Sequence, residues 1–198
     1  MTFQMKKSML FEYYYDKPNE ETGKGGIEQV ADKELLKLFG SDYIMVDSVD
    51  FALTDEEGKE LTETQIETVK GMADKYAKQI NAGEKTFSEI VKAYTGNAPS
   101  NVVEPTKEDP ATLSKTAAIY SADDEDTTMY DMFGAIKKKK NFEYGKAYVV
   151  GGKDEGAYYL AILYNQQKDK FRFEQQRATL LHSLKSETFD ELLAKEAE

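Results

Sequence analysis

The sequence predicts an α+β protein, in which a central part made of strands and helices carries further helices at both of its ends. Of the 198 residues, 40% are hydrophobic and 12% are aromatic, which is enough to fill a core and argues against a disordered chain. Residues 43–53 alternate in hydrophobicity as a strand does, whereas residues 66–80 repeat apolar side chains at intervals of three and four, as a helix does. The chain shows no internal repeat.

Two helices are predicted before the first strand. Residues 1–15 carry apolar side chains at a helical spacing, and this helix is expected to end before Pro18. The polar, glycine-rich residues 19–26 are typical of a loop. A short helix is expected over residues 31–39 and is predicted to end at Gly40, because glycine often follows the last helical residue.

Two amphipathic helices are predicted after the strand. Thr62 and Gln65 have the Thr-x-x-Gln spacing of a capping box, which marks the first turn of a helix. Apolar side chains then follow one helical face as far as Gly83, which is expected to end the helix. A second amphipathic helix is expected over residues 87–94.

The second half of the chain is predicted to complete the central part and to close with helices. Residues 96–112 contain three of the four prolines and are expected to form a long loop. The next elements are expected to be a short strand, a helix and a two-strand hairpin, at residues 115–120, 127–136, 146–150 and 157–164. The chain is expected to end with one helix from about Asp169 and a second helix from Ser186.

Charge and the scarce residue types exclude several classes of function. The chain has 37 acidic and 26 basic residues, a net charge of −11, which argues against a general nucleic-acid-binding protein. It has no cysteine, so disulfides, thiolate nucleophiles and cysteine-based zinc sites are excluded. The single histidine, His182, lies among leucines and is interpreted as a structural or surface residue. We therefore expect no metal and no cofactor.

No membrane-spanning segment is expected, because no stretch approaches the roughly 20 apolar residues that a spanning helix needs. Residues 1–7 have no apolar core of the kind found in signal peptides, so no signal peptide is expected within this sequence.

Four motifs occur in order between residues 43 and 165. Residues 84–95 follow a helix end and read Glu-Lys-Thr-Phe-Ser-Glu-Ile-Val-Lys-Ala-Tyr-Thr. Residues 129–133 contain a Met-x-x-x-Phe pair, and residues 144–150 and 156–163 each place a glycine before a strand. Together with the strand at residues 43–53, these motifs resemble the parvulin-type peptidyl-prolyl isomerases.

The helices at both ends resemble the chaperone parts of extracytoplasmic foldases of Gram-positive bacteria, and residues 177–185 are similar to the closing helix of that family. The resemblance implies a parvulin-like small antiparallel sheet with helices in residues 43–165. It also implies an N-terminal helical part, residues 1–42, and C-terminal helices, residues 166–198, that pack together. Members of this family are exported to the cell surface, often as lipoproteins, so contact with a membrane is expected only through a lipid anchor that this sequence does not contain.

The resemblance also implies a proline pocket. Active parvulins place one histidine in the first strand and one in the last, and the matching positions here are Ser48 or Asp50, and Tyr158. Asp50 and Tyr158 are predicted to act in catalysis, and Ser48, Met129 and Phe133 to bind substrate. Isomerisation needs no covalent step, because its barrier of about 20 kcal/mol comes from amide resonance. Alternatively, Met129 and Phe133 are core residues of an amphipathic helix.

These observations leave more than one function open. The first is an exported folding factor, a peptidyl-prolyl isomerase and chaperone that binds unfolded or proline-containing polypeptides and no nucleic acid. The second is a non-catalytic chaperone or protein-interaction module on the same fold. A third is a solute-binding or structural surface protein, which a large enclosed pocket away from the proline site would support.

Overall fold

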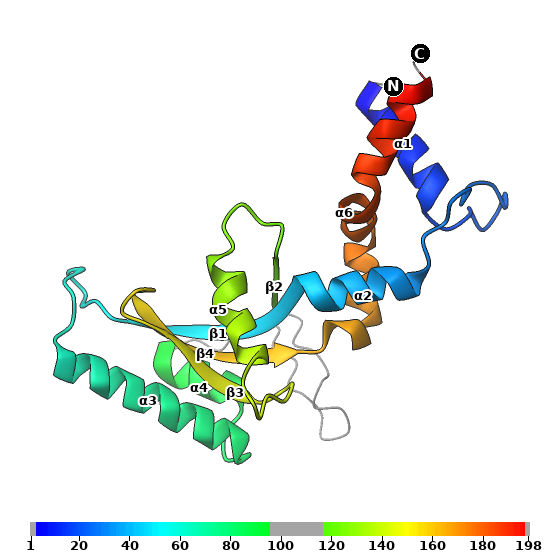
Figure 1. Ribbon diagram of the computed structural model, residues 1–198. Coiled ribbons are helices and arrows are strands. Elements are labelled where there is room, and N and C mark those ends of the chain that lie inside the picture. Colours follow the sequence, from blue (N-terminus) through cyan, green and yellow to red (C-terminus); the bar gives the residue numbers. More distant parts are fainter. Residues whose placement is uncertain (1–2, 96–116, 197–198) are drawn as a thin grey trace. The chain divides into compact units, whose positions relative to one another are not determined.

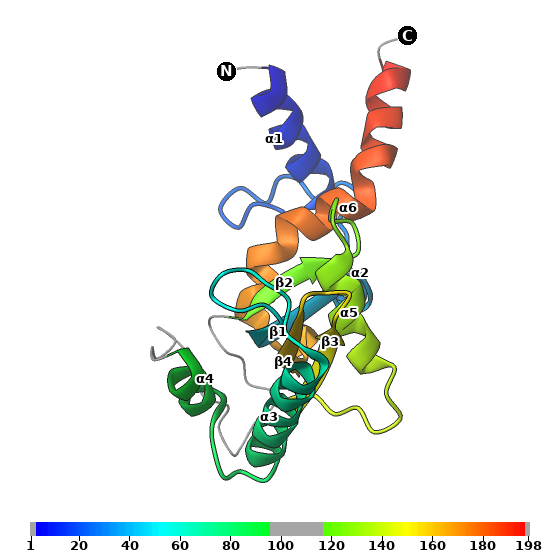
Figure 2. The same cartoon turned by 90° about the vertical axis from the view of Figure 1, so that its left-hand side faces the viewer.

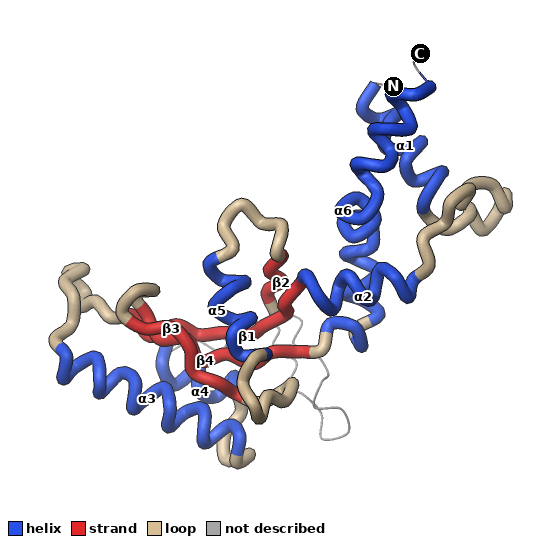
Figure 3. Tube along the Cα trace, viewed as in Figure 1, coloured by secondary structure: helices blue, strands red, loops and turns tan. Residues whose placement is uncertain are grey.

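The computed structural model describes residues 3–95 and 117–196 of the chain (Figure 1). The loop predicted at residues 96–112 lies outside the described residues. Within them, six α-helices and one four-stranded antiparallel sheet confirm the predicted α+β class. Helices and strands can be followed along the chain in Figure 3.

The elements, in chain order, are α1 (Phe3–Tyr15), α2 (Asp32–Asp42), β1 (Tyr43–Ala52), α3 (Glu63–Asn81), α4 (Phe87–Thr95), β2 (Ala118–Ser121), α5 (Thr128–Lys137), β3 (Ala147–Gly152), β4 (Ala157–Tyr164), the short 3-10 helix η1 (Gln166–Lys168) and α6 (Lys170–Glu196).

The chain divides into two units. The sheet unit is Asp42–Asp169, and the helical unit combines Met1–Ser41 with Lys170–Glu198. The sheet unit holds 24 acidic and 15 basic residues, a net charge of −9, whereas the helical unit holds 13 and 11, a net charge of −2. Most of the negative charge of the protein therefore belongs to the sheet unit.

The sheet has the strand order β2-β1-β4-β3, so that β1 and β4 lie at its centre. These two strands are antiparallel and pair from Met45, opposite Tyr164, to Ala52, opposite Ala157. Because successive side chains of a strand point to opposite faces, this register fixes which residues share a face.

Each face of the sheet is covered by helices. Figure 1 shows α3 and α4 on one side of the sheet and α5 on the other. The buried core under α3 and α4 includes Met45, Val49, Phe51, Leu160 and Ile162 of the strands. The core under α5 consists of Ile44, Val46, Ala161 and Leu163 of the strands with Phe133 and Ile136 of α5. We call these two sides of the sheet the α3 face and the α5 face.

Side-chain hydrogen bonds cap the first turns of α3 and α4, the two helices that cover the α3 face. The backbone N–H of Thr62 donates to Oε1 of Gln65 at 2.9 Å, which confirms the predicted capping box at α3. At α4, the backbone N–H of Thr86 donates to Oε2 of Glu89 at 2.8 Å. This hydrogen bond and one from the Thr86 hydroxyl hold the pKa of Glu89 below its ordinary value.

Two predicted helix boundaries are wrong. The second helix does not end at Gly40, because α2 continues through this residue to Asp42, next to the first residue of β1. No new helix begins at Ser186, because α6 is one continuous helix from Lys170 to Glu196. The buried side chains of Leu181 and Phe189, eight residues apart, lie on one helical face and carry the helix across Ser186.

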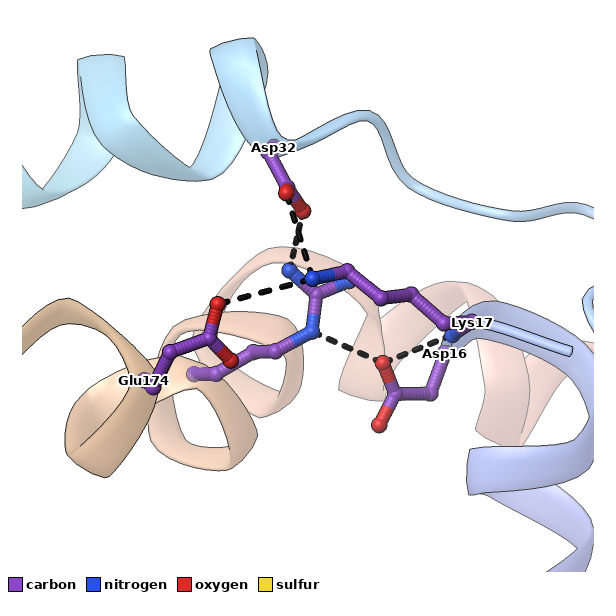
Figure 4. Close-up of polar contacts among 5 residues, drawn as sticks. Asp16, Lys17, Asp32 and Glu174 are labelled. Atoms are coloured by element: carbon purple, nitrogen blue, oxygen red, sulfur yellow. Dashed lines mark hydrogen bonds and ion pairs between the residues drawn. The ribbon is translucent and has the colours of Figure 1, made fainter. Parts of the chain in front are cut away.

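A buried arginine joins three segments of the helical unit, as Figure 4 shows. Arg177 of α6 is 6% exposed, and its Nε donates to Oδ1 of Asp16, at the end of α1, at 2.8 Å. Its Nη1 donates to Oδ1 of Asp32, the first residue of α2. Lys17 extends the network with ion pairs to Asp32 at 3.2 Å and to Glu174 at 3.4 Å.

Candidate functional site

Ser48 and Asp50 lie together on the α5 face of the sheet. Ile44 and Val46 of β1 contact the core under α5, and the two-residue period of a strand places Ser48 and Asp50 on the same face. Unlike the two buried residues, Ser48 and Asp50 are exposed. The end of β1 therefore presents a hydroxyl and a carboxylate to solvent.

Tyr158 does not lie on this face. It is paired with Phe51 and packs half-buried against the core under α3 and α4, on the opposite side of the sheet from Asp50. Asp50 and Tyr158, which are both predicted to act in catalysis, therefore lie on opposite faces of the sheet and do not meet in one pocket. The residue opposite Asp50 is Tyr159, because moving one residue along β4 changes the face.

Phe133 forms the buried base of this site. Its side chain is 0% exposed, and its ring lies 5.7 Å from Tyr120 and, edge to face, 5.9 Å from Tyr159. Met129, one helical turn earlier on α5, is half-buried against the same core. This geometry agrees with the alternative in which Phe133 is a core residue, whereas Met129 keeps exposed surface.

Tyr159, in place of Tyr158, brings a phenol hydroxyl to the face of the sheet that carries Asp50. Partial burial, followed by the negative charge of Asp50, raises the pKa of Tyr159 above its ordinary value of 10.0. The phenol is therefore protonated at neutral pH and can donate a hydrogen bond. The site combines a neutral hydroxyl donor, a carboxylate acceptor and an aromatic surface, and this combination can hold an amide group.

Sequence reasoning missed Tyr120 and Tyr159 because two features were ambiguous. The adjacent tyrosines Tyr158 and Tyr159 point to opposite faces, and only the pairing of β4 with β1 decides which one meets Asp50. Tyr120 reaches the site through the pairing of β2 with β1, opposite Ile44. A signal for Tyr159 was present, since the motif Gly156-Ala157-Tyr158-Tyr159 allows an alignment one residue later.

His182 lies on α6 of the helical unit and is exposed, with its ring edge to face against Phe11 at 5.5 Å. Among the described residues, no group of three or more His, Cys, Asp or Glu side chains is arranged to hold a metal ion. None of the helices in residues 3–95 and 117–196 has the length and apolar character that a membrane span requires.

Comparisons of the chain with models of protein families, with curated proteins and with solved structures found no match.

Proposed function

We propose that the protein is an exported folding factor that binds unfolded or proline-containing polypeptide on the α5 face of its sheet unit and isomerises X-Pro bonds there. The observation that carries the proposal is the group of Ser48, Asp50 and Tyr159 on one face of the sheet, where the half-buried Met129 packs against the same core under α5. The parvulin-like motifs provide the class of reaction. Export and a lipid-anchored position at the cell surface belong to the proposal through the resemblance of the terminal helices to extracytoplasmic foldases.

The chemistry requires only that the site hold the twisted amide better than the planar one. The ring of Tyr159 and the side chain of Met129 provide apolar surface for the pyrrolidine ring. The hydroxyl of Tyr159 donates to a substrate carbonyl, and the carboxylate of Asp50 accepts from a substrate N–H. Each 1.36 kcal/mol of preference for the twisted amide accelerates the reaction about tenfold.

The test is a measurement of cis–trans exchange in an Ala-Pro peptide by NMR, with the protein added in catalytic amounts. The protein is expected to accelerate exchange, and Asp50→Asn and Tyr159→Phe are each expected to reduce the acceleration about tenfold. Glu67→Gln is the matched control, because Glu67 is an exposed acid on α3, which covers the other face of the sheet. No acceleration above buffer would remove the isomerase proposal.

A second candidate is a non-catalytic chaperone or protein-interaction module that uses the same face. It is favoured by the complete burial of Phe133, which keeps this predicted substrate-binding side chain out of contact with a substrate. This candidate predicts that the protein suppresses aggregation of an unfolded client without accelerating proline isomerisation. It also predicts that Met129→Ala, which shortens a half-buried apolar side chain, weakens this suppression while Glu67→Gln leaves it unchanged.

A further inference from the structure

The helical unit contains a cavity of about 620 Å³ between α1 and α6. It is lined by residues of these two helices and by Asp16, which follows α1. This volume lies within the range of roughly 300 to 1,000 Å³ that is typical of ligand sites. We call this cavity the α1–α6 groove.

The floor of the α1–α6 groove is apolar. Leu181 and Phe189 are buried, each 1% exposed, and Phe11 is half-buried above them. The ring of Phe11 lies edge to face against Phe189 at 5.3 Å and against His182 at 5.5 Å. The ring of Phe11 therefore packs against both α6 residues.

The α1–α6 groove is open to solvent. Ser8 and Glu12 on α1, and Ala178, His182 and Asp190 on α6, are exposed although they line it. Figure 2 shows the two helices diverging toward the two chain ends. An open cavity between two diverging helices suits a third helix better than an enclosed solute, so it does not support the solute-binding hypothesis.

The rim of the α1–α6 groove carries an excess of negative charge. Three carboxylates and one lysine line it. Lys7 pairs with Asp190 at 2.5 Å, and Asp16 pairs with Arg177 at 2.8 Å. Among the described residues, no basic side chain forms an ion pair with Glu12. Glu12 is therefore the carboxylate that an incoming positive charge meets without displacing a partner.

We propose that the α1–α6 groove binds an amphipathic helix of a partner polypeptide that has apolar side chains on one face and Lys or Arg beside them. The apolar face fits the floor of Phe11, Leu181 and Phe189, and a basic side chain pairs with Glu12. This site lies in the helical unit and requires no proline, so it goes beyond the function proposed for the sheet unit.

The experiment uses fluorescence anisotropy of a labelled helical peptide made of Leu and Lys in an amphipathic pattern, with the full chain. Saturable binding is expected, and a counterpart with Glu in place of every Lys is expected not to bind. Glu12→Lys is expected to weaken binding about tenfold. Glu191→Lys makes the same charge change on an exposed α6 residue that does not line the groove, and is expected to change binding less than twofold.

A second pair of variants tests the shape of the groove. Ala178→Trp fills the groove from an exposed position and is expected to weaken binding about tenfold. Ser183→Trp adds the same ring at an exposed position outside the groove, and as the control it is expected to leave binding unchanged.

An equal loss of binding in Glu12→Lys and Glu191→Lys would contradict the proposal, because binding would then follow net charge. A dimer in sedimentation analysis that the peptide does not displace would also contradict it, because a second copy would then occupy the groove. Asp50→Asn is expected to leave peptide binding unchanged, which separates this result from the test of isomerisation.

Discussion

The two units of the molecule are stabilised by different interactions. In the sheet unit, apolar side chains are buried on both faces of one sheet, so the alternation of each strand decides which residues meet. In the helical unit, a buried arginine joins segments that lie 161 and 145 residues away in the sequence. The exposed end of β1 therefore gains its neighbours from strand register, whereas α1 and α6, which line the α1–α6 groove, are joined by a charge network beside it.

The largest expected effect is on the sheet unit. Phe133→Ala removes a fully buried ring and is expected to lower the free energy of unfolding of this unit by about 3–5 kcal/mol. Urea unfolding followed through amide resonances of β1 and β4 measures the loss. Met129→Ala, at a half-buried position on the same helical face, is the control and is expected to cost about 1 kcal/mol. Equal losses in the two variants would show that Phe133 is not the base of this core.

A smaller effect is expected when the charge network of the helical unit is broken. Arg177→Met removes the guanidinium from Asp16 and Asp32 and is expected to cost about 2 kcal/mol, less than for fully buried pairs because both carboxylates reach solvent. Urea unfolding followed through amide resonances of α1 and α6 measures this loss. Lys17→Met removes two exposed ion pairs, to Asp32 and Glu174, and is expected to cost less than about 0.5 kcal/mol because both pairs are screened by solvent. A loss as small for Arg177→Met would contradict the role given to the buried arginine.

Strand geometry in the sheet unit can be tested at two glycines. Gly151 of β3 has a φ of +84°, and an added Cβ would lie 2.5 Å from the carbonyl oxygen of Ala157. Gly156 has a φ of +67°, but no atom lies within 4 Å of an added Cβ. Gly151→Ala is therefore expected to cost about 3 kcal/mol and Gly156→Ala about 1 kcal/mol, because the second has backbone strain without the clash. Thermal unfolding of the two variants compares them, and the reverse order would contradict the register of β3 with β4.

The smallest effect is a pH dependence of the helical unit. Burial alone would raise the pKa of Asp32, but hydrogen bonds and positive charge from Arg177 and Lys17 outweigh it, so the pKa lies below its ordinary value of 3.8. Asp32 therefore contributes stability above its unfolded pKa, and this contribution is lost as the pH falls through the lower, folded pKa. Asp32→Asn is expected to cost at most about 1 kcal/mol at neutral pH, since the carboxylate is partly exposed. Urea midpoints of variant and parent should converge well below pH 3.8, and a constant difference would contradict the pKa direction.

The sequence predicts the local elements of the fold better than it predicts the site. The capping box of Thr62 and Gln65 and the strand predicted at residues 43–53 depend on neighbours in the chain. The structure contains both, although exposure alternates only in the second half of β1. The choice between Tyr158 and Tyr159 depends on strand pairing across more than 100 residues, where an error of one position changes the face. The pairing of Arg177 with Asp16 and Asp32 has no local pattern at all, so only the folded helical unit brings these charges together.

The central claim, that polypeptide binds on the α5 face of the sheet unit, is tested most directly with a spin label. The chain has no cysteine, so Ser48→Cys provides a single attachment point at an exposed position of this face. Glu67→Cys provides the control on α3, on the other side of the sheet. The proline resonances of an Ala-Pro peptide are predicted to broaden with the label at position 48 and to stay sharp with the label at position 67. Equal broadening from both labels, or none from position 48, would contradict the claim.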